Sequence, residues 1–289
     1  MLKIKKIPQA IHTMFKTIKS NKKILIGSLF LTLLIVFSFV MPFFSFIQNP
    51  NVSTNNKRLE GISWKHWMGT DSTGRDLFSR VIYGAKISLQ IAFYSVLISS
   101  IIGSFLGIMA GYFRGFFDTV INFVCDILVV FPDFILAIVI MFFLNKSMTS
   151  LVIVLSISHI PSFIRVMRAN TMKIKQKDFI KTSKALGASD IKIIFRHVLP
   201  HLTSFFIIQI TLSMSSAILT ASGLGFIGLG LDPQIPEWGS ILSSSKNDMR
   251  WYFHLFLGPF IVIVLTCLSF NLIGSGLMEH FDPKNEQQE

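Results

Sequence analysis

The 289-residue sequence is poor in charge, in acidic residues above all, and in cysteine. Only 15% of the residues are charged, and 15 acidic residues stand against 27 Lys and Arg. A soluble globular domain carries about 25% charged residues, so this composition argues against that class. The two cysteines, Cys125 and Cys267, lie in apolar runs without metal-ligand spacing. Neither a disulfide framework nor a zinc site is therefore indicated, and both cysteines are expected to be small core residues.

The sequence also lacks a GxxxxGK[ST] phosphate-binding loop. Gly223, Gly225 and Gly228 do spell GxGxxG, but they end an uncharged run and do not follow a strand. This placement argues against a dinucleotide site and favours close helix packing or an interrupted helix end. The seven histidines are scattered, and Pro200 interrupts their one i, i+4 pair. The chain is thus expected to be no enzyme and to hold no metal or cofactor of its own.

Hydrophobic residues, in contrast, make up 51% of the chain. A membrane-spanning helix needs about 20 mostly apolar residues. The runs that meet or approach this length are 24–47, 87–113, 119–144, 147–164, 202–231 and 251–278. They predict an all-α polytopic membrane protein with six transmembrane helices and both termini on one side.

The positive charge predicts the orientation of these spans. Placing the N-terminus inside puts twice as many Lys and Arg on the inner side as on the outer side. The basic residues cluster next to the spans, which favours membrane lipid over nucleic acid as their partner. The predicted segments are a cytoplasmic tail 1–23, a first span 24–47, an outer loop 48–86, a five-helix core 87–278 that includes a cytoplasmic loop 165–199, and a cytoplasmic tail 279–289.

The cytoplasmic loop contains a basic, amphipathic segment, FIKTSKALGASDIKIIFRHVLPH, residues 179–201. Helix formers before Gly187 predict a short helix, and Gly187 is placed to end it in a left-handed turn. Ser189 or Asp190 can cap a second helix, which is expected to stop before Pro200. From composition alone, the segment fits equally well a helix that lies on anionic lipid.

Three segments carry a resemblance to a known family. In the cytoplasmic loop, the triplet Lys181, Thr182, Ser183 is followed by Gly187 and then by Leu-Pro at 199–200. The other two are HWMGTDSTGRDLFSRVIYGAKISL, residues 66–89, and GLGFIGLGLDPQIPEWGSIL, residues 223–242. In these segments the chain resembles the permease subunits of binding-protein-dependent ABC importers, in the dipeptide, oligopeptide and nickel branch, and specifically its C-type permease.

The resemblance implies a type I ABC importer permease fold in the plasma membrane of a bacterium. It implies that the chain forms half of a translocation path for short peptides, nickel or metal chelates and works by alternating access. The expected partners are a second homologous permease, two cytoplasmic ATPase subunits that bind the ATP and Mg, and an extracellular solute-binding protein.

The resemblance further implies that the short cytoplasmic helix docks on an ATPase and transmits its closure to the spans. The residues expected at this contact are Lys181, Thr182, Ser183, Ala185, Leu186, Gly187, Ala188 and Ser189. The family usually has Glu where this chain has Lys181. An ion pair that relatives make there is therefore expected to be absent or inverted.

The outer-loop motif is expected to be structural, in preference to contacting substrate. It consists of Gly69, Thr70, Asp71, Gly74, Arg75 and Asp76. Its glycines and capping residues fit a turn that leads into a helix from Asp76, and this helix enters the second span. Arg75 can pair with either aspartate.

Two carboxylates lie within the third predicted span, where charge is costly and suggests function. Asp126 and Asp133 are seven residues apart and share a helix face, allowing for a kink at Pro132. With His159 in the next span, they suggest a path for a cationic or metal-bearing substrate. Alternatively, Asp126 hydrogen-bonds within the bundle and Asp133 lies near an interface.

Two other functions remain open on the residues alone. An ion-coupled secondary transporter would use Asp126, Asp133 and His159 as its ion or proton relay. That function leaves the amphipathic cytoplasmic loop unexplained. A non-transporting membrane scaffold would tolerate charge changes throughout the spans.

Overall fold

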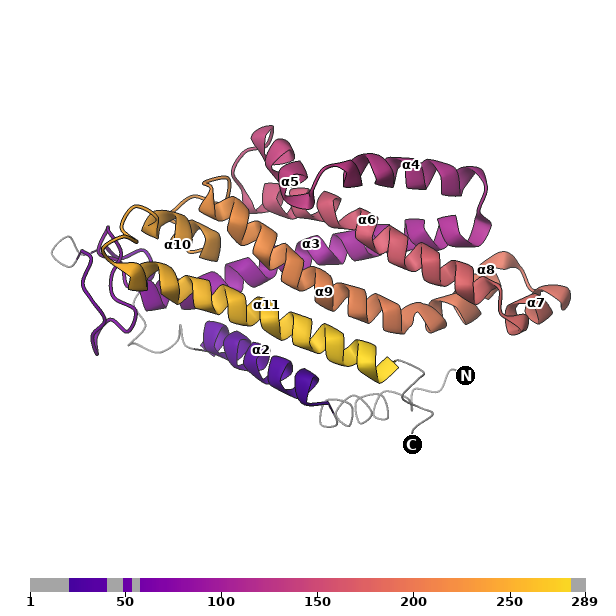
Figure 1. Ribbon diagram of the computed structural model, residues 1–289, viewed down its shortest axis with the longest axis horizontal. Helices are drawn as coiled ribbons and strands as arrows, with labels where there is room; N and C mark the ends of the chain where they lie inside the picture. Colours follow the sequence, from indigo (N-terminus) through magenta and orange to yellow (C-terminus); the bar gives the residue numbers. More distant parts are fainter. Residues whose placement is uncertain (1–20, 41–48, 54–57, 282–289) are drawn as a thin grey trace.

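The structure, a computed structural model, describes residues 21–40, 49–53 and 58–281. Its long helices lie side by side in an elongated bundle (Figure 1). Two short helices mark the opposite ends of this bundle, and we refer to them as the α7 end and the α10 end. Within the described residues the regular structure is helical, apart from one isolated bridge between Thr70 and Asp76. The predicted all-α class is confirmed.

The helices follow one another along the chain as a series of crossings between the two ends. They are α2 (Lys22–Val40), α3 (Leu77–Phe113), α4 (Phe116–Val130), α5 (Asp133–Phe142), α6 (Met148–Lys175), α7 (Asp178–Ala185), α8 (Asp190–Ile193), the π-helical turn η4 (Ile194–Val198), α9 (Leu199–Phe226), α10 (Trp238–Ser245) and α11 (Phe253–Phe281). Five segments are long and apolar enough to cross a membrane, and α4 with α5 makes a sixth if the bent pair is one span. These segments agree in order with the six predicted spans, although residues 41–47 of the first lie outside the described residues.

α3 and α6 approach so closely that glycine is required at their contact. A Cβ atom added to Gly103 would lie 2.6 Å from Cβ of Phe163. The same addition at Gly107 would lie 2.6 Å from the carbonyl oxygen of Ile164. Small residues at four-residue spacing allow two helix backbones to meet in this way. This close contact between α3 and α6, the second and fourth crossings, forms the centre of the bundle.

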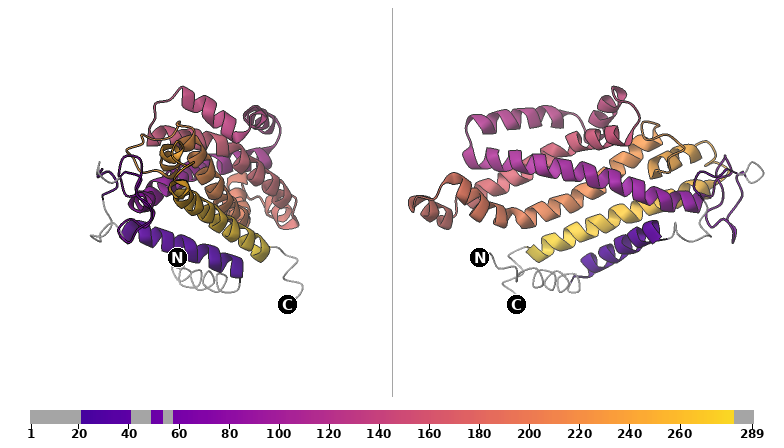
Figure 2. Two further views of the ribbon diagram at one scale, coloured as in Figure 1. Left: turned by 60° about the vertical axis from the view of Figure 1, so that its left-hand side comes forward. Right: turned by 180° about the vertical axis from the view of Figure 1, so that it is seen from behind.

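α2 packs against α11 on one side of the bundle, as both views in Figure 2 show. Near the α7 end, Asn21 Nδ2 donates to Glu279 Oε2 at 3.2 Å, and Lys23 forms an ion pair with Glu279. The first and last described segments therefore meet at the same end of the bundle. This is the result expected from an even number of crossings.

The third crossing is broken, which corrects one prediction. α4 and α5 meet at 86°. Phe131 and Pro132 adopt extended backbone, with ψ angles of 132° and 137°, because a proline lacks an N–H and disfavours helix in the residue before it. Asp126 and Asp133 consequently do not share a helix face. The bend is larger than the kink that the sequence suggested.

Two further boundaries differ from the sequence prediction. α6 contains Pro161 and continues to Lys175, so residues 165–175 belong to a helix and the connecting loop is shorter than 165–199. The prediction that a helix stops before Pro200 is wrong, since residues 190–226 form one continuous span. The N–H of Leu199 bonds to the carbonyl of Ile194 in a π-helical turn. This wider turn accommodates the ring of Pro200, which would clash with the backbone of a regular α-helix.

Candidate functional site

A rigid corner forms at the α7 end, where α7 meets α8. Gly187 has φ +83°, so the predicted left-handed turn is confirmed. The N–H of Gly187 bonds to the carbonyl of Lys184, and the N–H of Ala188 bonds to that of Ser183. These bonds satisfy carbonyls at the end of α7, as in a Schellman-type helix end. Ser189 occupies the N-cap position of α8, one of the two positions that the sequence suggested, but its side chain makes no capping hydrogen bond.

The corner is anchored on one side and open on the other. Ile180 is buried in an apolar cluster that includes Tyr112, Ile193 and Val198. On the open side, Leu186 is 82% exposed, and no atom lies within 4 Å of a Cβ built at Gly187. The corner therefore has a fixed base and a free apolar tip.

A small hollow with a basic wall lies beside this tip. Its volume is about 290 Å³, and it is lined by Ser183, Leu186, Gly187, Ala188, Lys192, Arg196 and His197. Lys181 pairs with Asp178 within α7 at 2.9 Å between Nζ and Oδ1. The structure thus brings all eight predicted contact residues together on α7 and the turn that follows it, with an excess of positive charge.

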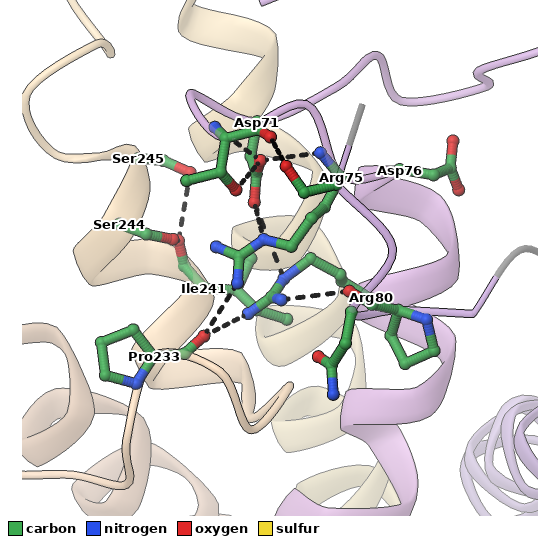
Figure 3. A network of polar contacts seen from close by, with 12 residues as sticks. Asp71, Arg75, Asp76, Arg80, Pro233, Ile241, Ser244 and Ser245 are labelled. Carbon is green, nitrogen blue, oxygen red and sulfur yellow. Dashed lines mark hydrogen bonds and ion pairs between the residues drawn. The ribbon is translucent and has the colours of Figure 1, made fainter. Parts of the chain in front are cut away.

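A polar network holds the outer-loop motif at the opposite, α10 end (Figure 3). Nε of Arg75 lies 2.7 Å from Oδ2 of Asp71, so Arg75 pairs with this aspartate. Asp76, the other predicted candidate, points away from the pair. Asp71 also accepts hydrogen bonds from the N–H and hydroxyl of Thr73. Burial alone would raise the pKa of Asp71, but the hydrogen bonds from Thr73 and Arg75 and the charge of Arg75 outweigh it and lower the pKa.

Arg80 extends this network to two distant segments. Its side chain is fully buried, with Nε 3.9 Å from Oδ2 of Asp71. Its guanidinium donates to the carbonyls of Pro233 at 2.7 Å and Pro50 at 3.2 Å. Arg75 also donates to Pro233, at 3.4 Å. One carboxylate and two arginines thus connect the start of α3 with the segments before and after it in the chain, which supports a structural role for the motif.

Asp76 caps α3, as predicted. Its Oδ2 accepts from the N–H of Ser79 at 2.7 Å and from the Ser79 hydroxyl at 2.6 Å. Its Oδ1 lies 2.8 Å from Nδ1 of His66, which is buried. The sequence prediction omitted His66 from the site, although the resembling segment begins with it. The contact between His66 and Asp76 could not be inferred from the sequence, because ten positions of irregular loop separate the two residues.

A fully buried carboxylate, Glu237, was also missed. It caps α10 by accepting from the N–H groups of Gly239 and Ser240, each at 2.8 Å. Ser88 of α3 lies 3.5 Å away, and a Cβ at Gly225 would come within 2.7 Å of the same carboxylate. Burial raises the pKa of Glu237 despite these hydrogen bonds. The glycines near position 225 therefore serve close packing at a helix end, as the sequence suggested.

The three candidate path residues separate into two groups. Asp126 pairs with Arg165 of α6 at 2.9 Å, and both side chains are largely exposed. Asp133 is the first residue of α5, and His159 is buried in α6. Among the described residues, Nε2 of His159 has no hydrogen-bond partner. Within the same residues, no group of three His, Cys, Asp or Glu side chains is placed to hold a metal ion.

The chain resembles known transport proteins in sequence and in fold. Residues 103–287 match the family described as binding-protein-dependent transport system inner membrane component. The glutathione transport system permease protein GsiD of Pectobacterium atrosepticum is 39% identical over 258 residues, which cover 89% of this chain and 86% of that protein. GsiD of Escherichia coli is 37% identical over 273 residues, covering 94% and 90%.

A solved structure shares the fold. The MetNI methionine ABC transporter in an inward-facing conformation superposes with a TM-score of 0.59 at 14% identity, covering 71% of this chain and 97% of that one. Family match, near-full-length relatives and apolar helices together indicate a multi-pass protein of the bacterial inner membrane. The chain belongs to the family of binding-protein-dependent inner membrane components, and it is a permease of the ABC importer type.

Proposed function

We propose that this permease forms half of a translocation path for short peptides. The observation that carries the proposal is its identity of 39% and 37%, over nearly the full length, with two permeases named for the transport of glutathione, a tripeptide. The other half of the path would come from a second, homologous permease. A solute-binding protein would deliver the peptide at the α10 end. The ion-coupled transporter is not favoured, because the relatives are ABC permeases.

Within this proposal the α7 end faces the cytoplasm, and the corner at Gly187 docks on one of two ATPase subunits, which bind the ATP and Mg. An exposed apolar tip on a fixed base suits insertion into a cleft of another subunit. The corner continues without a break into the 190–226 span. A displacement of α7 and α8 would therefore be passed to the bundle interior.

The test is uptake by the complete transporter in proteoliposomes, with its partner permease, its ATPases and its binding protein. Radiolabelled glutathione and trialanine are the probes. The proposal expects uptake that requires both ATP and the binding protein and that survives an ionophore which abolishes the proton gradient. Uptake that continues without ATP and stops with the ionophore would reject it, as would failure to move either tripeptide under all conditions.

A further inference from the structure

The ion pair between Asp126 and Arg165 lies part of the way along the third crossing and is exposed. Asp126 is ten residues beyond Phe116, the first residue of α4. At 1.5 Å per residue this is about 15 Å along the helix, near the middle of a hydrocarbon core that is about 30 Å thick. Yet the side chain of Asp126 is 69% exposed and that of Arg165 is 48% exposed. Charged groups at this depth face a water-filled cavity or protein, since contact with lipid tails is costly.

The surroundings of the pair form a polar stripe across three helices. Asn122 lies one turn before Asp126 on α4. Ser162 lies one turn before Arg165 on α6, and its hydroxyl accepts from Nε2 of Gln209 on α9 at 2.7 Å. We call these five residues the polar stripe.

Apart from Thr119, the rest of the exposed surface of α4 is apolar. Phe117, Val120, Phe123, Val124, Ile127 and Val130 are all exposed on it. The two members of the polar stripe on α4 thus lie on one side of the helix, the side on which Asp126 pairs with Arg165 of α6. A polar surface at membrane depth beside an apolar one is the arrangement expected where helices line a translocation path.

We propose that Asp126 and Arg165 recognise the two charged termini of a peptide in the translocation path. The peptide ammonium takes a place beside Asp126, and the peptide carboxylate binds the guanidinium of Arg165. This inference rests on the proposed function and adds to it the recognition of zwitterions. The chemistry agrees, because a guanidinium binds a carboxylate through parallel hydrogen bonds, while Arg165 uses one nitrogen, Nη2, for Asp126.

A pre-existing ion pair suits transient binding. Exposed ion pairs contribute little free energy, so the pair opens at low cost. When a zwitterionic peptide binds, the ion pair between Asp126 and Arg165 is replaced by two ion pairs, one between Asp126 and the peptide ammonium and one between Arg165 and the peptide carboxylate. Binding in a transport path must be favourable enough for entry and weak enough for release. An exchange of like contacts meets both conditions.

The same two helices provide an internal comparison. Arg168 of α6 pairs with Asp118 of α4, with 2.7 Å between Nη2 and Oδ2 and a second contact from Nε. These side chains are less exposed, at 29% and 17%. This second pair attaches α4 to α6 and lies nearer the α7 end. It is therefore a control for the loss of an ion pair between α4 and α6, at a more buried position where Asp118 also accepts a hydrogen bond from Asn122 at 2.7 Å.

The experiment measures uptake of trialanine, N-acetyl-trialanine and trialanine amide by the reconstituted transporter. Each rate is divided by the wild-type rate for the same peptide, so the preference of the binding protein cancels. Asp126→Asn should reduce uptake of the two peptides with a free ammonium by about tenfold and leave the acetylated peptide near its wild-type rate. Arg165→Gln should instead spare the amide. Asp118→Asn should change all three peptides by one common factor.

A second measurement tests whether the stripe is accessible to water. Ser162→Cys is placed in a Cys125→Ala, Cys267→Ala background and treated with a charged, membrane-impermeant thiol reagent in the assembled transporter. We expect labelling, and we expect trialanine to slow it.

Three results would overturn the inference while leaving peptide transport intact. The first is an equal effect of Asp126→Asn on uptake of all three peptides. The second is unchanged uptake in both Asp126→Asn and Arg165→Gln. The third is a Ser162→Cys side chain that resists labelling because lipid or a partner subunit covers it. A wild-type transporter that moves no trialanine would reject the proposed function itself, and this inference with it.

Discussion

Asp71 and Arg75 form an ion pair of 2.7 Å, and the same Asp71 carboxylate lies 3.9 Å from the buried guanidinium of Arg80. One aspartate therefore balances two arginines at the α10 end. The guanidinium of Arg80 also bonds to two carbonyls from distant segments. Removing the carboxylate would leave two cations close together with little water around them.

We expect Asp71→Ala to lower the free energy of unfolding by about 3 kcal/mol or more, because it leaves buried charge uncompensated. Thermal unfolding of the purified permease in detergent measures the effect. Asp178→Ala is the control, since this aspartate is 94% exposed and pairs only at the surface. Its substitution should change stability by less than about 1 kcal/mol. Similar melting temperatures for both variants would argue against a structural role for the outer-loop motif.

The buried carboxylate of Glu237 predicts a dependence of stability on pH. Burial raises its pKa above the usual 4.5. A carboxyl group with a raised pKa in the folded state favours the folded state when it is protonated. Its contribution is fully present below 4.5 and is lost as the pH rises through the folded-state pKa.

Glu237→Gln removes this titration while keeping an acceptor for the N-terminus of α10. We expect the melting temperature of the wild type, relative to that of the variant, to fall as the pH is raised from about 4 to about 8. Differential scanning fluorimetry in detergent measures both proteins in parallel. A constant difference across this range would show that the carboxyl of Glu237 has the same pKa in the folded and unfolded protein, which would contradict the prediction.

Gly187 tests the proposed coupling corner. Its φ of +83° is unfavourable for a β-branched residue, and there is open space around its Cβ position, so Gly187→Val strains the backbone without a steric clash. We expect the variant to insert and assemble but to lose most ATP-driven peptide uptake. Gly187→Asn should retain uptake, because asparagine tolerates this conformation better than other residues with side chains.

Gly115 supplies the control for strain alone. It has φ +67° and an equally open Cβ position, in the connection between α3 and α4. Gly115→Val should impose similar strain outside the proposed docking corner and should retain more uptake than Gly187→Val. Normal transport by Gly187→Val would mean that the left-handed corner is not needed for coupling.

Features set by short-range physics could be predicted from the sequence. The apolar runs predicted the crossings, because spanning helices need long apolar segments whatever they pack against. The turn at Gly187 was predictable because glycine is favoured where φ is positive. The cap at Asp76 was predictable for a similar reason, since an aspartate before an apolar run commonly caps a helix.

Features set by tertiary contacts could not be predicted. Nothing local indicates that Asp126 pairs with Arg165, 39 positions away. Glu237 lies in a segment rich in proline and glycine that resembles an exposed loop, yet it is fully buried. Pro200 followed the usual rule for ending a helix, but a widened turn before it kept the helix continuous. In each case the deciding partner is distant, or the backbone departs from its regular form.

The unbroken span from Asp190 to Phe226 has a consequence that reaches beyond packing. One continuous helical segment connects the α7 end with the α10 end, so a displacement at either end can be transmitted to the other. Thermodynamic linkage requires that binding at one end change the affinity at the other end by the same factor as the reverse. Under the proposed function, binding of the loaded solute-binding protein near the α10 end and binding of ATP by the ATPase docked at the α7 end would therefore each change the affinity of the other by the same factor.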